Sequence, residues 1–231
     1  MNRLSLFRNI DFAILLLVSI TISLSLPAGA QGQEPSIAGL PGRLAWKYSP
    51  LAWHVDAGDQ LKISAGKKTD WFVDPFDGRV ENSAPILFFA PGPDYVLNAK
   101  VSVGFRSKWD AGAFMIWADD HHWAKLSFEL SPENQPTMVT VVTRGLSDDC
   151  NSNPISGNEV FLQVAKSRNT YVFYSSLDGH DWNILRTFNL DTNLKQMVGF
   201  EAQSPAGSGA DATFSEIHYS PTRIKNIYTG Q

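Results

Sequence analysis

The chain has 231 residues, of which 19 are Lys or Arg and 23 are Asp or Glu, giving a formal net charge of −4 at pH 7. A protein that neutralises several phosphates needs a basic face, so this charge balance excludes nucleic acid as an expected partner. The one cysteine, Cys150, cannot form an internal disulfide, and the fold must therefore be stabilised by its core.

Residues 1–30 have the pattern of a secretory signal peptide. Arg3 and Arg8 precede an apolar run from Phe12 to Leu26, and the small residues A-G-A follow at 28–30. The run is about fifteen residues long, whereas a membrane-spanning helix needs roughly twenty predominantly apolar residues. We therefore expect cleavage, a secreted or periplasmic protein, and no membrane association after signal cleavage.

Residues 31–43 are expected to form a flexible leader, because they contain three glycines and no periodic apolar pattern. From 44 to 220, short runs rich in Val, Ile, Phe, Tyr and Trp alternate with turn residues, and no window keeps a helical period. Strands are predicted at 51–55, 60–65, 85–89, 95–105, 112–118, 123–130, 138–144, 160–166, 170–176, 182–188, 197–202 and 211–219. This pattern predicts one all-β domain, a two-sheet sandwich or jelly roll, with a C-terminal tail at 221–231.

The stretch M-I-W-A-D-D-H-H-W-A-K-L-S-F-E-L at 115–130 places two aspartates and two histidines between two apolar runs. We interpret 119–122 as the bend of a hairpin, where short polar side chains satisfy their own backbone. Adjacent histidines on a strand end point to opposite faces, so His121 and His122 do not predict a transition-metal site. A structural calcium ion at Asp119 and Asp120 stays an alternative; otherwise no metal or cofactor is expected.

Six motifs in order resemble one known family. They are T-D-W-F at 69–72, D-A-G-A-F-M-I-W-A-D-D-H-H-W-A-K-L-S-F-E at 110–129, V-V-T-R-G-L-S-D-D at 141–149, V-F-L-Q-V at 160–164, Y-S-S-L-D-G-H-D-W at 174–182 and V-G-F-E-A-Q-S-P at 198–205. Together they resemble the domain-of-unknown-function family 1349, also called the regulation-of-enolase-1 family, of the concanavalin A-like lectin/glucanase superfamily.

This resemblance implies a concanavalin A-like jelly roll, two antiparallel sheets with one concave face, of the kind found as the C-terminal domain of some β-xylosidases and arabinofuranosidases. It implies no activity, because a fold alone does not carry function. Family members often have Ser-Asp-Trp where this chain has S-D-D-C at 147–150. An aromatic wall of a ligand cleft is therefore expected either to be missing or to be supplied by Trp109 or Trp123.

A ligand-binding groove is the hypothesis for the concave face. Trp123, Lys125 and Glu129 share one face of their strand, since successive strand side chains alternate. Thr140 and Arg144 share a face of strand 138–144, and Asp70 begins a charged loop that could border the groove. An aromatic platform with charged neighbours suits a sugar ring and its hydroxyls. The alternative is a solvated face on which Lys125 and Glu129 form a weak ion pair.

Catalysis is the second hypothesis for this face. Glycoside hydrolysis uses two carboxyl groups on either side of the scissile bond, and the alternation here supplies only Glu129. A partner could come from Asp70, Asp119 or Glu201, and no residue is assigned as catalytic.

The expected function is a non-catalytic, lectin-like module that binds a glycan or another extracytoplasmic ligand. A polysaccharide-active glycoside hydrolase or lyase and a protein-interaction scaffold stay open as alternatives.

Overall fold

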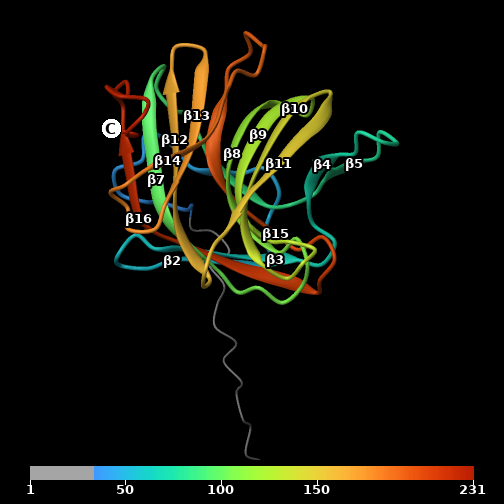
Figure 1. Cartoon of the computed structure of the whole chain (residues 1–231). Helices are drawn as coiled ribbons and strands as arrows, with labels where there is room; N and C mark the ends of the chain where they lie inside the picture. The colour runs from blue at the N-terminus through green and yellow to red at the C-terminus, as the bar shows by residue number, and fades with distance from the viewer. Residues whose placement is uncertain (1–33) are drawn as a thin grey trace, which may run out of the picture. The chain divides into compact units, whose positions relative to one another are not determined.

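The computed structural model describes residues 34–231, so the predicted signal peptide at 1–30 and the first residues of the expected leader lie outside the described residues. Sixteen strands, all paired antiparallel, make up the regular structure of this part (Figure 1). None of the described residues belongs to a helix that is long and apolar enough to cross a membrane.

The strands form two seven-stranded sheets that pack face to face. Sheet A has the order β1 (Ala45–Trp46), β6 (Ile86–Phe89), β15 (Met197–Gln203), β8 (Ala111–Asp119), β9 (His122–Leu130), β10 (Pro136–Arg144) and β11 (Leu146–Pro154). Sheet B has the order β14 (Asn183–Phe188), β13 (Thr170–Ser176), β12 (Glu159–Ser167), β7 (Tyr95–Val103), β16 (Gly209–Ser220), β3 (Leu61–Gly66) and β2 (Ala52–Val55). The predicted all-β sandwich is confirmed.

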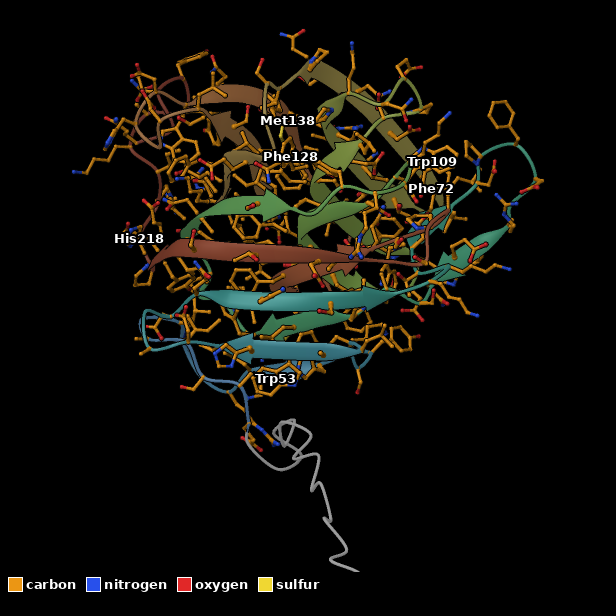
Figure 2. The ribbon with its side chains drawn as sticks, turned by 90° about the horizontal axis from the view of Figure 1, so that it is seen from below. Trp53, Phe72, Trp109, Phe128, Met138 and His218 are labelled. Carbon is orange, nitrogen blue, oxygen red and sulfur yellow. The ribbon has the colours of Figure 1, made fainter. Side chains whose placement is uncertain are left out.

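The main core lies between the two sheets. On β7 buried residues alternate with half-buried ones along the whole strand, because every second side chain points at sheet A. Phe128 of β9 and Met138 of β10 enter the same core from the opposite side (Figure 2). The predicted face of β9 made of Ala124, Leu126, Phe128 and Leu130 is confirmed for the first three, which are fully buried in this core.

A short hairpin covers the other face of sheet A. It consists of β4 (Trp71–Val73) and β5 (Val80–Asn82), and it lies beside β10 and β11 (Figure 1). The backbone N–H of Val73 donates a 2.9 Å hydrogen bond to Ser147 Oγ of β11. Trp71 packs edge-on against Trp123, with ring centroids 5.9 Å apart. This face therefore has a small apolar core of its own.

Twelve predicted strands are present with ends close to those expected, and four further strands were not predicted. β1, β4 and β5 have only two or three residues each, too few for a periodic signal. β11 has the sequence L-S-D-D-C-N-S-N-P and is mostly exposed. It forms the edge of sheet A, where backbone pairing with β10 rather than side-chain burial decides the conformation.

The C-terminal residues pack against the outer side of sheet B. Tyr174 donates a hydrogen bond of 2.8 Å to the carbonyl oxygen of Ile227, and Gln163 donates one of 2.8 Å to that of Gly230. Ile224 and Ile227 also pack against a small apolar cluster on this side. The predicted tail is therefore held against the domain.

Gly112 of β8 lies where the two sheets approach closely. A Cβ atom at this position would lie 2.9 Å from Ala212 Cβ and 3.0 Å from Val101 Cγ1 of sheet B. We expect Gly112→Ala to lower the free energy of unfolding by about 1–3 kcal/mol, the usual cost of overpacking. Urea denaturation measures this. The control is Gly66→Ala, whose Cβ would meet nothing closer than 3.6 Å; equal effects of the two changes would contradict the explanation.

Candidate functional site

The candidate site lies on the face of sheet A that points away from sheet B, here called the outer face. β9 contributes Trp123, Lys125, Ser127 and Glu129 to it, as the alternation predicts. All four are buried, with Glu129 the most accessible at 8% exposure. The alternative of a solvated face is therefore wrong: Trp71 of the β4–β5 hairpin packs on Trp123, and Asp70 in the loop before β4 pairs with Lys125.

Small residues on β8 leave room at the centre of the outer face. Ala111 lies between Gln203 of β15 and Glu129 of β9 in the strand register. Ala113, two residues further on, lies next to Glu201 of β15. Because alanine fills little of the space above the sheet, the long polar side chains of β15 and β9 can extend over β8 toward one another.

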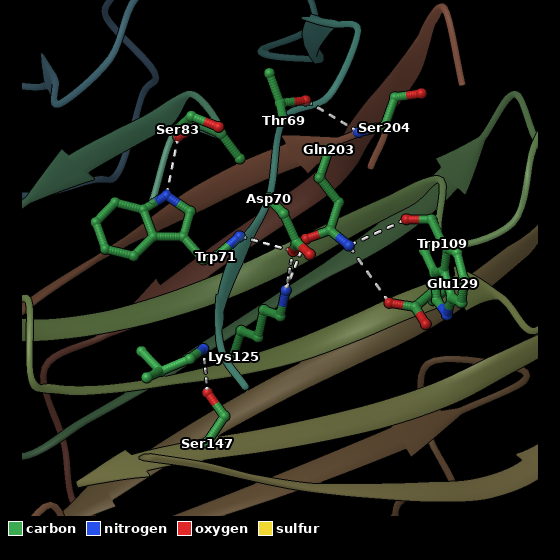
Figure 3. Close-up of polar contacts among 12 residues, drawn as sticks. Thr69, Asp70, Trp71, Ser83, Trp109, Lys125, Glu129, Ser147, Gln203 and Ser204 are labelled. Atoms are coloured by element: carbon green, nitrogen blue, oxygen red, sulfur yellow. Dashed lines mark hydrogen bonds and ion pairs between the residues drawn. The ribbon is translucent and has the colours of Figure 1, made fainter. Parts of the chain in front are cut away.

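Lys125 and Gln203 connect the polar groups into one network (Figure 3). The Lys125 ammonium donates to Asp70 Oδ1 at 3.0 Å and to Gln203 Oε1 at 2.7 Å. The amide nitrogen of Gln203 donates to the carbonyl oxygen of Trp109 at 3.0 Å and, weakly, to Glu129 Oε2 at 3.4 Å. One amide group therefore separates the ammonium from the Glu129 carboxyl.

The loop before β4 is fixed to the end of β15. Ser204 donates its backbone N–H to Thr69 Oγ1 at 3.0 Å and to the Thr69 carbonyl oxygen at 3.2 Å. Asp70 then accepts the backbone N–H of Trp71 at 2.7 Å through Oδ1, the oxygen that also faces Lys125. The second carboxylate oxygen, Oδ2, makes no hydrogen bond among the described residues, and the Asp70 side chain is 20% exposed.

A pocket of about 610 Å³ opens above this network. Its wall includes two aromatic side chains, Phe72 from β4 and Trp109 from the loop before β8, on the same side of the molecule (Figure 2). The other lining residues are Lys68, Asp70, Asp74, Arg79, Glu81, Lys125, Glu129, Pro132, Val139, Val141, Asp149, Asn151, Gln203 and Pro205. The expectation that Trp109 supplies an aromatic wall agrees with this geometry.

Burial shifts the protonation of the groups in the network. It raises the pKa of Glu129 to about 8 and that of Glu201 to about 7, although the Lys125 ammonium opposes both shifts. Burial alone would lower the pKa of Lys125, but Asp70, Glu201 and Glu129 together raise it above its ordinary value. At neutral pH the site therefore combines a charged lysine with a protonated Glu129.

Two predicted site residues lie on the wrong face for this pocket. Thr140 pairs with the core residue Leu126 and is buried on the side of β10 that faces sheet B. Arg144, four residues further along β10, lies on the same side of the strand as Thr140. Its guanidinium donates to the carbonyl oxygen of Asn189 at 3.1 Å. The sequence of β10 is apolar on both faces, M-V-T-V-V at 138–142, so alternation could not tell which set faces sheet B.

Trp123 is also not an accessible platform. It is on the predicted face, but it is fully buried beneath Trp71 of the hairpin. The structure does bring Asp70, Lys125 and Glu129 together at the pocket. Their role in binding stays a prediction.

Gln203 and Phe72 are among the pocket residues that sequence reasoning missed. A signal for Gln203 was present, because Glu201 and Gln203 alternate with the core residues Phe200 and Ala202. Phe72 could not be found in this way, since its orientation depends on the unpredicted β4–β5 hairpin.

The bend between β8 and β9 is a turn that the Asp119 carboxylate stabilises. Asp119 Oδ1 accepts the backbone N–H groups of His121 and His122 at 2.8 and 2.7 Å. Asp120 pairs with the Lys47 ammonium at 3.1 Å. Both carboxylates thus have partners from the chain, which confirms the interpretation as a turn. Across residues 34–231, no group of three or more His, Cys, Asp or Glu is arranged to hold a metal ion.

The buried carboxyl group of Glu201 is expected to make the free energy of unfolding depend on pH. Both of its carboxyl oxygens are buried without a hydrogen-bond partner among the described residues. Its folded-state pKa of about 7 lies above the ordinary 4.5, so its stabilising effect is complete at low pH and is lost as the pH rises through about 7. Glu201→Gln removes the charge but keeps the shape.

We expect Glu201→Gln to match the wild type near pH 5 and to be more stable by on the order of 1–2 kcal/mol at pH 9. Urea denaturation at the two pH values measures the difference. Glu159→Gln, an exposed change on β12, is the control. Destabilisation of Glu201→Gln by the same amount at both pH values would show that the carboxyl makes a required polar contact instead.

The solved structures with a similar fold include proteins of known and unknown activity. A functionally unknown protein from Saccharomyces cerevisiae has a TM-score of 0.70 and 26% identity, and the match covers 77% of this chain and 95% of that one. The glycoside hydrolase family 43 protein BlXynB of Bacillus licheniformis has a TM-score of 0.58 and 18% identity, over 77% of this chain and 37% of the hydrolase. An alginate lyase of Klebsiella pneumoniae has a TM-score of 0.50 at 12% identity, over 73% and 83%. These last two likenesses concern the fold alone.

Sequence comparison gives a closer relationship. The curated protein named Regulation of enolase protein 1 of Saccharomyces cerevisiae is 27% identical over 173 residues, which cover 74% of this chain and 86% of that protein. The family model described as "Protein of unknown function (DUF1349)" matches residues 46–222, nearly all of the sandwich. The chain therefore belongs to the family of proteins of unknown function DUF1349.

Proposed function

We propose that the protein is a carbohydrate-binding module whose ligand site is the pocket on the outer face of sheet A. The observation that carries this proposal is the pocket itself, about 610 Å³ with aromatic walls and a polar floor. Small-molecule sites typically combine such apolar walls with a few polar groups that fix orientation. Sugars have both an apolar ring face and a rim of hydroxyl groups, so this combination suits them.

Trp109 is held in a position to stack on a sugar ring. Its side chain is 41% exposed, and its backbone has φ of 65°, a strained value for a residue other than glycine. Strands β9 and β15 both hold this backbone, because the Trp109 N–H donates to the Leu130 carbonyl oxygen of β9 at 2.7 Å and the Trp109 carbonyl oxygen accepts from Gln203 of β15. Strained residues that persist in this way often lie at ligand sites.

The charges of the pocket favour a neutral glycan. Five acidic residues line it against three basic ones, which are Lys68, Arg79 and Lys125. Arg79 lies near both Asp74 and Glu81, and Lys125 pairs with Asp70. Because two of the three cations already have anionic partners, a uronic acid would bring a carboxylate into a site with few free positive charges. Neutral oligosaccharides are therefore the proposed ligand class.

The test is binding to an array of neutral and uronate oligosaccharides, followed by calorimetry with the best ligand. We expect neutral sugars to bind and Trp109→Ala to weaken binding about tenfold, the effect of losing one stacking contact. Trp53→Ala on β2 is the matched control, since Trp53 lies outside the pocket. Unchanged binding in Trp109→Ala and Phe72→Ala, or a preference for uronates, would contradict the proposed site.

We also propose that the protein acts outside the cytoplasm, on the basis of the signal-like pattern in residues 1–30. Expression of the full-length gene in a secreting host should yield a mature chain that begins after Ala30. Mass spectrometry of the purified protein measures this mass. Recovery of the intact 231-residue chain from the cytoplasmic fraction would refute the proposal.

A further inference from the structure

We propose that the pocket also cleaves its ligand by hydrolysis of a glycosidic bond, with Glu129 as the proton donor and Asp70 as the carboxylate that activates water. This inference rests on the proposed glycan site and adds a reaction to it. It starts from the arrangement of two carboxyl groups that line the same pocket and are held by different partners.

Glu129 has the surroundings of a general acid. Its side chain is 92% buried, yet it lines the pocket. Its one hydrogen bond among the described residues is the weak contact of 3.4 Å from Gln203 to Oε2, so Oε1 is free to meet a ligand. Burial favours the protonated form, and the pKa of about 8 keeps that proton on the carboxyl at neutral pH.

Asp70 has the opposite surroundings. The Lys125 ammonium lies 3.0 Å from its Oδ1, and the Trp71 N–H donates to the same oxygen. Both partners contact Oδ1, Oδ2 accepts no hydrogen bond among the described residues, and Asp70 is one of the residues that line the pocket. Two carboxyl groups that line one pocket, one buried with a single weak hydrogen bond and one paired with a cation, are the kind of pair that acid–base cleavage of a glycoside needs.

The two carboxyl groups are linked through Lys125 and Gln203, because Lys125 contacts both Asp70 and Gln203, and Gln203 contacts Glu129 (Figure 3). Inverting glycosidases use one carboxyl group as the acid and the other as the base that activates water, whereas in retaining enzymes the second carboxyl group is a nucleophile. The roles proposed for Glu129 and Asp70 therefore predict inversion of the anomeric centre.

The step balances with water as the co-reactant. Glu129 gives its proton to the glycosidic oxygen as the bond from that oxygen to the anomeric carbon breaks, and the bonding electron pair leaves with the oxygen. A water molecule forms the new bond to the anomeric carbon and gives one proton to Asp70. Exchange with solvent then returns a proton to Glu129 and removes one from Asp70, so the net reaction consumes one water.

The experiment uses the purified protein with xylo-, cello-, manno- and maltohexaose, measuring binding by calorimetry and products by chromatography. We expect at least one hexaose that binds to be cleaved, with an inverted product by NMR. Glu129→Gln and Asp70→Asn should each lower kcat/KM at least 100-fold, while Glu129→Gln keeps its affinity within about threefold. The controls are Glu159→Gln and Asp181→Asn, matched changes at exposed positions outside the pocket. Thermal unfolding of every variant checks the fold.

The pH profile provides a second readout. We expect kcat/KM to fall as the pH rises through about 8, where Glu129 loses its proton. The charged groups that act on it are Lys125 on its own strand, Asp70 in the loop before β4, Glu201 on β15 and Asp149 on β11.

The outcomes separate this inference from the proposed binding function. A hexaose that binds but yields no product would overturn hydrolysis and leave the binding function standing. Cleavage that survives Glu129→Gln would overturn the assignment of the acid, and a retained product would overturn the role of Asp70 as base. No binding to any hexaose would contradict the proposed function, and the hydrolysis that rests on it.

Discussion

The ion pair between Lys125 and Asp70 is the interaction on which the outer face of sheet A depends. A buried ammonium group is costly unless it is paired and hydrogen-bonded, and Lys125 is 2% exposed. Its partner comes from the loop before β4, which is itself fixed to the end of β15 through Thr69 and Ser204. The ion pair therefore joins the hairpin to the centre of the sheet, and the hairpin in turn buries Trp123. Removing Asp70 would leave the buried ammonium without the carboxylate that pairs with it.

The same ion pair shapes the pocket. Lys125 draws Gln203 toward it, and Gln203 holds the Trp109 carbonyl oxygen and the Glu129 carboxyl with its other end. Alanines at 111 and 113 leave the space that these side chains occupy. The floor of the pocket is thus one connected polar network, in which each group is oriented by the next. A preorganised arrangement of this kind is what binding and catalysis both require.

The proposed binding and the proposed catalysis require different ionisation states of the carboxyl groups in this pocket. A glycan can be held by aromatic walls and polar groups whatever their ionisation, whereas cleavage needs one carboxyl neutral and another ionised. Burial raises the pKa of Glu129, whereas Asp70 pairs with the Lys125 ammonium. The fold itself does not decide between binding and catalysis, because sandwiches of this kind have diverse activities. The residues of the site, rather than the fold, distinguish the two proposed functions.

The sequence by itself determined the all-β class, most strands, and the face of β9 that carries Lys125 and Glu129. These follow from period-two alternation, which is a local property of each strand. It could not determine that this face is covered, because the cover is a hairpin of three-residue strands without periodic signal. Nor could it assign Thr140 and Arg144 to a face, since β10 is apolar on both sides. Only the tertiary structure decided which carboxyl groups surround Lys125, because Asp70, Glu129 and Glu201 come from distant segments. The distances between these residues depend on strand order and register, which cannot be predicted from alternation within one strand.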